Sequence, residues 1–276
     1  MIPLLFILGC TPKPQSTALS SCDSESDQAL YVFQSIQYAR RENNVAWGFD
    51  IDGHTSSRED AEGCFHEDMV DPLGNEGIDN TMSSLLPTLD LTEAFAVEGI
   101  LQDSINTGEL ILMLQFLGLD DSHNDECVEL RLLKGTGTPM VGTNGQILDG
   151  QSFDIQPNIS PSITEDVSLS DGVFTASPIE MDIPFRVLDK HLEFSMRNGS
   201  IRGIIQPDGS IEGHLGGAIP LSELIEIVSF EEVANTDFLI DLLSRAADLY
   251  PDEDGICESF SVALSFRAIP AYLYED

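Results

Sequence analysis

The chain has 276 residues, with 48 acidic and only 12 basic side chains, and a formal net charge of −36 at pH 7. This charge excludes nucleic-acid binding, which needs a basic surface, and electrostatic attraction to anionic lipids. Hydrophobic residues make up 42% of the chain, which is enough for a sizeable core. Three explanations of the charge stay open: adaptation to high salt, binding of divalent cations, or plain solubility.

The first ten residues read MIPLLFILGC, an apolar run that ends in Gly9 and Cys10. The run is too short to span a bilayer and has the length of an export signal. Its Ile-Leu-Gly-Cys ending resembles the lipobox of bacterial lipoproteins, which implies that residues 1–9 are a signal peptide and that Cys10 carries lipid such as palmitate. The alternative is a buried N-terminal strand with an incidental cysteine.

The residues after Cys10 predict a tether and a location. Residues 10–27 are rich in Ser, Thr, Pro and Gln, which is typical of a flexible stalk. Thr11 resembles the residue found after the lipidated cysteine in lipoproteins passed on to the outer membrane, so we expect that membrane rather than the inner one. Because no later segment has 18 uninterrupted apolar residues, lipid is the expected attachment to the membrane.

The first half of the body mixes strands and helices. Strands are predicted over Leu30–Tyr38 and Trp47–Gly53, the second closing in an acidic turn. A short helix is predicted from Ile78 to Leu86, ending near Pro87, and a longer one from Leu91 to Asn106.

The second half is richer in strands. The apolar run 110–119 and the alternating segment 127–133 predict two paired strands, and Asn-Gly and Asp-Gly turns between 146 and 217 favour hairpins. Two helices follow within 220–249, and 260–274 predicts a last strand that rejoins the sheet.

These elements predict a mainly β protein of the α+β class. We expect a single domain over 28–276, built as an antiparallel β-sandwich or jelly roll, with helices at about 78–106 and 220–249.

The cysteines fit an exported protein. If Cys10 carries lipid, an even number remains: Cys22, Cys64, Cys127 and Cys257. Two disulfides are therefore expected, with three possible connectivities. The absence of any C-x-x-C pair argues against a four-cysteine zinc site.

Motifs for catalysis are missing. The chain has no G-x-S-x-G, H-E-x-x-H or Walker A sequence, and its five histidines form no spaced pair. Pairs of carboxylates are unavoidable among 48 acids, so a glycosidase pair cannot be inferred from their number. An enzyme is the less favoured interpretation.

Two acidic turns are candidates for calcium binding. Residues 50–53 and 252–255 both read D-x-D-G, part of the pattern in which spaced carboxylates and a tight glycine turn surround a hard cation. Neither has the first acid of an EF-hand loop. The candidate ligands are Asp50, Asp52, Asp68, Asp79, Asn80, Asp252 and Asp254. The alternative is that these are ordinary Asp-Gly turns.

Four segments together resemble a group of uncharacterised predicted lipoproteins of myxobacteria and their relatives. The segments are Gly48-Phe49-Asp50-Ile51-Asp52-Gly53, Gly77-Ile78-Asp79-Asn80, Gly142-Thr143-Asn144-Gly145 with Gly150-Gln151, and 247–249 through 254–257. The resemblance implies a surface-attached, mostly β lipoprotein and names no activity.

The sequence therefore predicts a lipid-anchored envelope protein with a non-enzymatic binding or structural role, stabilised by disulfides and calcium. Its expected partners are the membrane, through the lipid, and an envelope protein, a glycan or a small molecule. Two alternatives stay open: a hydrolase acting on glycans through paired carboxylates, and a carrier of apolar ligands.

Overall fold

A computed structural model describes residues 28–61, 63–90, 97–187, 190–230 and 236–274. The strands in this part of the chain are β1 (Gln28–Tyr38), β2 (Ile111–Leu117), β3 (Asp125–Thr136), β4 (Gln151–Ile155), β5 (Ser162–Ser170), β6 (Val173–Val187), β7 (Lys190–Ile205), β8 (Ile211–Pro220), β9 (Leu249–Pro251) and β10 (Cys257–Leu273). The helices are α1 (Thr81–Leu89), α2 (Val97–Thr107), α3 (Leu221–Phe230) and α4 (Thr236–Ala246).

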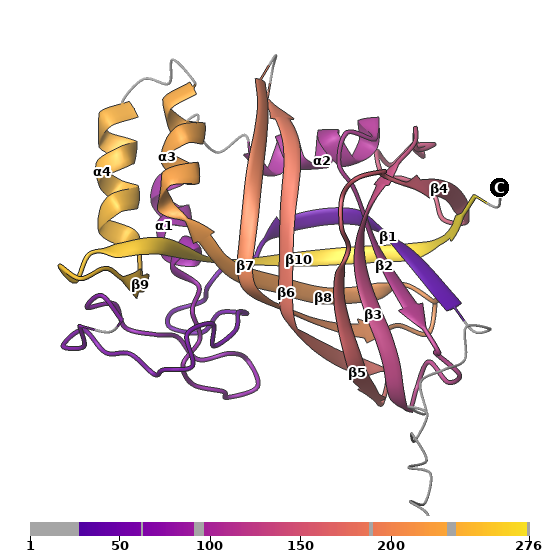
Figure 1. The fold of residues 1–276 in the computed structure, drawn as a ribbon, viewed down its shortest axis with the longest axis horizontal. Coiled ribbons are helices and arrows are strands. Elements are labelled where there is room, and N and C mark those ends of the chain that lie inside the picture. Colours follow the sequence, from indigo (N-terminus) through magenta and orange to yellow (C-terminus); the bar gives the residue numbers. More distant parts are fainter. Residues whose placement is uncertain (1–27, 62, 91–96, 188–189, 231–235, 275–276) are drawn as a thin grey trace, which may run out of the picture.

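Eight of the strands close into an antiparallel barrel, in the order β1-β2-β3-β5-β6-β7-β8-β10 and back to β1. The barrel closes where the first strand of the described chain pairs with the last, from Leu30 opposite Ala271 to Tyr38 opposite Leu264. β4 lies outside this circuit, parallel to β10 and antiparallel to β3, and β9 pairs with the start of β10. Figure 1 shows the barrel and the helices around it.

The expected sandwich or jelly roll is therefore wrong. Alternating strands and Asn-Gly or Asp-Gly hairpins are equally compatible with a sandwich and a barrel, because both are antiparallel and both bury one face of each strand. The difference lies in the long-range pairings of β1 with β10 and of β3 with β5, which no local pattern predicts.

Apolar side chains fill the interior of the barrel. The ring of Phe116 makes edge contacts with Tyr31 and Phe174, at centroid distances of 5.7 and 5.0 Å, and Phe33 packs on Phe266 at 4.6 Å. The same core contains buried residues from all eight strands of the barrel, including Leu114, Leu130, Val167, Ile201 and Leu215. An eight-stranded barrel is just wide enough for side chains to fill it, as they do here.

The helices cover the barrel at two places. α1 packs with α3 and α4 through a second core that includes Met82, Leu86, Leu224, Leu243 and Phe260, and α2 lies across β1 (Figure 1). In the described part of the chain, no helix is long and apolar enough to cross a membrane.

The predicted positions of helices and strands agree with the structure better than the predicted topology does. The predicted helical regions contain all four helices, and the predicted strand pair 110–119 and 127–133 corresponds to β2 and β3. Two details differ. α1 continues through Pro87 to Leu89, and the expected strand 47–53 is a loop with a single bridge, Phe49 to Asp79.

One of the two expected disulfides is fully described. Cys64 is bonded to Cys257, which joins the long loop after β1 to the start of β10. Cys127 is also disulfide-bonded. Its partner must lie outside the described residues, as do Cys10, Cys22 and the predicted signal peptide and stalk.

Candidate cation site

The candidate site lies in the long loop between β1 and α1, residues 39–80. This loop packs against the outside of β8: Trp47 stacks on His214 at 4.4 Å with an interplanar angle of 20°. A Cβ atom at Gly216 would lie 2.9 Å from the ring of Phe49, so the missing side chain leaves room for that ring. The barrel wall thereby holds the segment that carries Asp50 and Asp52.

The two motifs 48–53 and 77–80 lie side by side. The backbone N–H of Asp79 donates to the carbonyl of Phe49 at 2.9 Å, and the Asp79 carboxylate accepts from the N–H of Ile51 at 2.7 Å. Gly48 allows this approach, because a Cβ there would lie 2.7 Å from Ile78 Cγ2 and 3.1 Å from the carbonyl oxygen of Asp79. The segments 48–53 and 77–80 thus form one local structure.

Three carboxylates meet where these motifs cross. One oxygen each from Asp50, Asp52 and Asp79 lies within 4.8 Å of the others. Two oxygens that bind one calcium ion at about 2.3–2.6 Å can be up to about 5 Å apart, so this spacing fits a shared ion. Asp50 and Asp52 also shape their own turn, since they accept the N–H groups of Gly53 at 2.7 Å and His54 at 2.9 Å.

Burial and like charge disfavour ionisation of these groups. Burial raises the pKa of Asp79 to about 9, and the charges of Asp248, Asp52 and Asp68 act in the same direction. Burial also raises the pKa of Asp68 to about 6. It raises the pKa of Asp52 as well. Carboxylates held this close together repel one another, and a divalent cation bound among them would relieve this repulsion.

Asp68 stands beside this cluster rather than in it. Its Oδ2 accepts the N–H of Ser56 at 2.5 Å, and its charge acts on Asp79. Asp68 is therefore close enough to affect the electrostatics of the site and is fixed by the loop backbone.

Asn80, also a candidate ligand, connects the loop to α1. It is the N-cap of α1, where its side-chain oxygen accepts from Ser83 N–H at 3.2 Å. Its amide donates to the carbonyls of Ala39 at 3.0 Å and Trp47 at 2.8 Å. The side chain thus ties the start of the helix to the loop, as expected for a capping asparagine.

The second acidic turn is separate from the cluster. Asp252 Oδ1 accepts the N–H groups of Asp254 and Ile256, both at 2.9 Å, and Gly255 N–H donates to the carbonyl of Asp252. These contacts form an Asp-Gly turn at the start of β10. The carboxylates of Asp252 and Asp254 do not belong to the three-carboxylate group.

Asp248, a buried aspartate that was not among the predicted site residues, acts on Asp79 through its charge. Asp248 accepts hydrogen bonds from Ser261 N–H at 2.8 Å, from the Ser261 hydroxyl at 2.5 Å and from the Thr81 hydroxyl at 2.8 Å. It is 6% exposed, and burial raises its pKa. The available signal was a lone carboxylate in the otherwise apolar run Ala246-Ala247-Asp248-Leu249.

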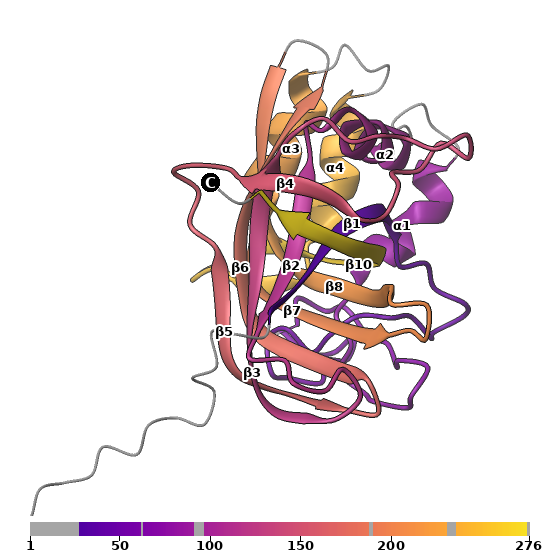
Figure 2. The ribbon, with the colours of Figure 1, turned by 90° about the vertical axis from the view of Figure 1, so that its right-hand side faces the viewer.

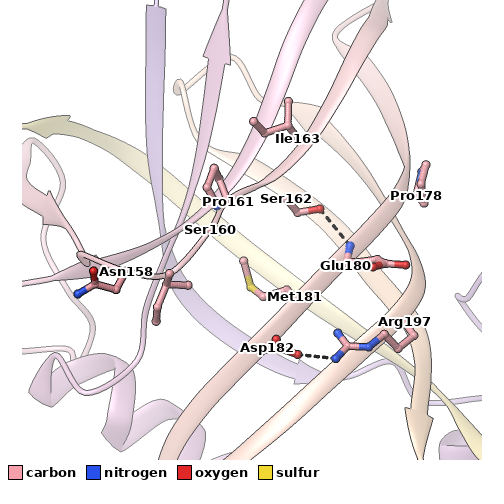
Figure 3. Close-up of a pocket in the computed structure, with 11 residues that line it drawn as sticks. Asn158, Ser160, Pro161, Ser162, Ile163, Pro178, Glu180, Met181, Asp182 and Arg197 are labelled. Atoms are coloured by element: carbon pink, nitrogen blue, oxygen red, sulfur yellow. Dashed lines mark hydrogen bonds and ion pairs between the residues drawn. The ribbon is translucent and has the colours of Figure 1, made fainter.

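A groove of about 850 Å³ lies elsewhere, between the start of β5 and the paired strands β6 and β7 (Figure 3). Among the residues that line the groove, the Arg197 guanidinium donates to Asp182 Oδ1 at 2.7 Å. The Ser162 hydroxyl oxygen accepts from the backbone N–H of Glu180 at 3.0 Å. The hydrogen bond from Arg197 lowers the pKa of Asp182. Of the described carboxylates with a raised pKa, none lines this groove.

The chain was compared with family models, curated proteins and solved structures. No family model matches it, and neither a curated protein nor a solved structure matches it.

Proposed function

We propose that this chain is a lipid-anchored envelope protein with a non-enzymatic binding or structural role, and that calcium organises the loop between β1 and α1. The observation that carries the calcium proposal is the meeting of Asp50, Asp52 and Asp79 from two separate motifs. Asp79 is only 4% exposed, and the charges that act on it are three other carboxylates. A cation would compensate this local excess of negative charge.

The ligand set favours calcium over softer metals. The cluster offers three carboxylate oxygens, which are ligands of hard cations, and it contains no thiolate from the described residues. Bound calcium would hold 48–53 against 77–80 and would not itself carry out a reaction. Its proposed role is to stiffen a surface loop for recognition.

The described residues support a binding role more than catalysis. A glycan hydrolase needs two acids facing a concave site, one with a raised pKa. In the groove, Asp182 is paired with Arg197 and its pKa is lowered. The described acids with raised pKa values lie outside the groove: Asp52, Asp68 and Asp79 are in the loop, and Asp248 is between α4 and β9. A carrier of apolar ligands is also less favoured, because side chains fill the barrel.

The lipid anchor is proposed from the lipobox alone. Metabolic labelling with palmitate tests it: wild type should incorporate label, and Cys10→Ser should not. Equal labelling of both chains would contradict the anchor and the proposed location in the outer membrane.

Thermal unfolding of the full chain tests the calcium proposal. Calcium at a hundred times its Kd adds about 2.7 kcal/mol to the stability, which raises the Tm by roughly 5–10 °C for a domain of this size. We expect this shift in wild type relative to EDTA, and its loss in Asp79→Asn. Asp149→Asn, in an exposed turn, is the matched control and should keep the shift. No shift in wild type would contradict the proposal and leave salt adaptation as the better explanation of the acidic surface.

A further inference from the structure

Figure 2 shows the end of the barrel at which β1 begins, with β4 and the last residues of β10 toward the viewer. Apolar and aromatic side chains on these segments and on the loop before β4 are exposed. They range from 42% to 63% exposed. We call them the tether-side patch; its members are Met140, Val141, Leu148, Ile155, Tyr272 and Tyr274.

Backbone hydrogen bonds connect the segments that carry the patch. Leu148 N–H donates to the carbonyl of Met140 at 3.0 Å, which closes the loop before β4. Tyr274 N–H donates to the carbonyl of Phe153 at 3.1 Å, and Tyr272 lies opposite Ser152 in the parallel pair of β4 and β10. The loop 140–150, β4 and the end of β10 therefore belong to the same end of the molecule.

The described part of the chain begins at this same end. β1 begins at Gln28, and Leu30 lies opposite Ala271 of β10, so the start of β1 is beside the last residues of β10. Residues 11–27 separate Cys10 from Gln28. A flexible chain of that length has a mean end-to-end distance of roughly 20–25 Å. A lipid on Cys10 would therefore keep the patch close to the bilayer.

We propose that the tether-side patch rests on the surface of a zwitterionic lipid bilayer. This inference rests on the proposed lipid anchor, which would keep the patch near the membrane. A short flexible tether raises the effective concentration of the patch at the bilayer into the millimolar range, so a weak contact is enough to hold it there. Tyrosine is suited to the boundary between headgroups and acyl chains, where its ring is buried and its hydroxyl stays hydrated.

Charge decides which lipid surface fits. Asp149 and Asp154 are exposed within the same segment, and the whole chain carries −36. An anionic bilayer would repel this end. The patch therefore fits uncharged or zwitterionic headgroups and makes its contact through apolar and aromatic side chains.

The proposed contact also orients the cation site. In Figure 1 the loop that carries Asp50 and Asp79 lies at the opposite end of the long axis from β4 and the C-terminus. With the tether-side patch on the membrane, the calcium-binding loop faces away from it.

Fluorescence quenching on vesicles tests this orientation. The full-length chain, with mass spectrometry establishing whether Cys10 carries lipid, is added to phosphatidylcholine vesicles whose acyl chains are brominated. Tyr272→Trp places an indole in the patch, and Ile256→Trp is the matched control, because Ile256 is 62% exposed and lies near the opposite end. Trp47 is common to both variants. We expect brominated lipid to lower the fluorescence of Tyr272→Trp and to leave that of Ile256→Trp unchanged.

The outcomes separate the patch from the anchor. A lipidated, vesicle-bound chain in which both variants are equally quenched or equally bright contradicts the patch and keeps the anchor. A chain that lacks lipid yet shows quenching at position 272 alone keeps the patch and contradicts the anchor. A chain that is neither lipidated nor bound contradicts both. Stronger quenching at 272 on anionic than on zwitterionic vesicles would overturn the choice of lipid.

Discussion

The carboxylate of Asp79 accepts a hydrogen bond from the backbone N–H of Ile51 at 2.7 Å, which joins two motifs that are 28 residues apart in the sequence. The contact turns the Asp79 side chain toward Asp50 and Asp52. It also buries a carboxylate among other carboxylates, an arrangement that is unfavourable unless a proton or a cation neutralises it. The calcium proposal follows from this relationship.

Substitution of Asp79 separates its two roles. Asp79→Asn keeps an oxygen that can accept from Ile51 N–H and removes the charge, so in EDTA the Tm should equal or exceed that of wild type. Asp79→Ala leaves that N–H without its acceptor and should cost about 1–3 kcal/mol. Thermal unfolding in EDTA compares the Tm of Asp79→Asn with that of wild type, and denaturant unfolding in EDTA measures the loss of stability in Asp79→Ala. A Tm for Asp79→Asn well below wild type in EDTA would contradict the buried, neutral state of Asp79.

The stability of the calcium-free chain should fall as the pH rises. Asp79 holds its proton in the folded state up to a pH of about 9, whereas in the unfolded chain its pKa is about 3.9. The unfolded state therefore binds fewer protons between these values. The stabilisation from this group is complete below about pH 4 and is lost as the pH rises to about 9.

Melting curves in EDTA at several pH values check this dependence. The Tm difference between Asp79→Asn and wild type should grow from pH 5 to pH 9, and calcium should reduce it, because the ion favours the carboxylate. A difference that stays constant over this range would show that Asp79 ionises with an ordinary pKa.

Asp248 should be a strong determinant of stability. Asp248→Ala would remove the acceptor for Ser261 N–H and for the hydroxyls of Ser261 and Thr81, all in the interior. We expect a loss of about 3 kcal/mol or more, since buried donors would be left unpaired. Asp254→Ala, in an exposed turn, should change the stability by less than about 0.5 kcal/mol. Equal effects of the two substitutions on urea unfolding would contradict the buried network.

The second disulfide should join Cys22 to Cys127. Cys127 is disulfide-bonded, and Cys64 is bonded to Cys257, so Cys10 and Cys22 are the two remaining candidates. A thioether-linked lipid on Cys10 would leave Cys22 as the partner. Peptide mapping without reduction should find the 22–127 pair in wild type and in Cys10→Ser. A 10–127 pair would contradict lipidation of Cys10.

The acidic residues of the candidate site were predictable, because each motif shows its carboxylates within a few residues of sequence. The acids of 50–53 and 77–80 stood out by their spacing beside glycine, and the structure brings three of them together. Asp248 was not predicted as a site residue, because a lone carboxylate in an apolar run suggests burial but does not show which groups it contacts. The capping role of Asn80 was not predicted, because it depends on the helix that starts beside it.

The topology was predictable only in part. Alternation and turn residues indicate antiparallel strands, and β2, β3 and β10 lie where the pattern places them. Closure into a barrel depends on β1 pairing with β10, residues more than 200 positions apart. That pairing buries the rings of Phe33 and Phe266 against each other, a contact that neither segment predicts alone.

Calcium titration by calorimetry tests the central claim most directly. The full, oxidised chain is titrated with CaCl₂ in moderate salt at neutral pH, beside Asp79→Asn and the control Asp149→Asn. The account predicts saturable binding of one ion per chain in wild type and in the control, and its loss in Asp79→Asn. Absence of saturable binding in wild type, or undiminished binding in Asp79→Asn, would contradict it.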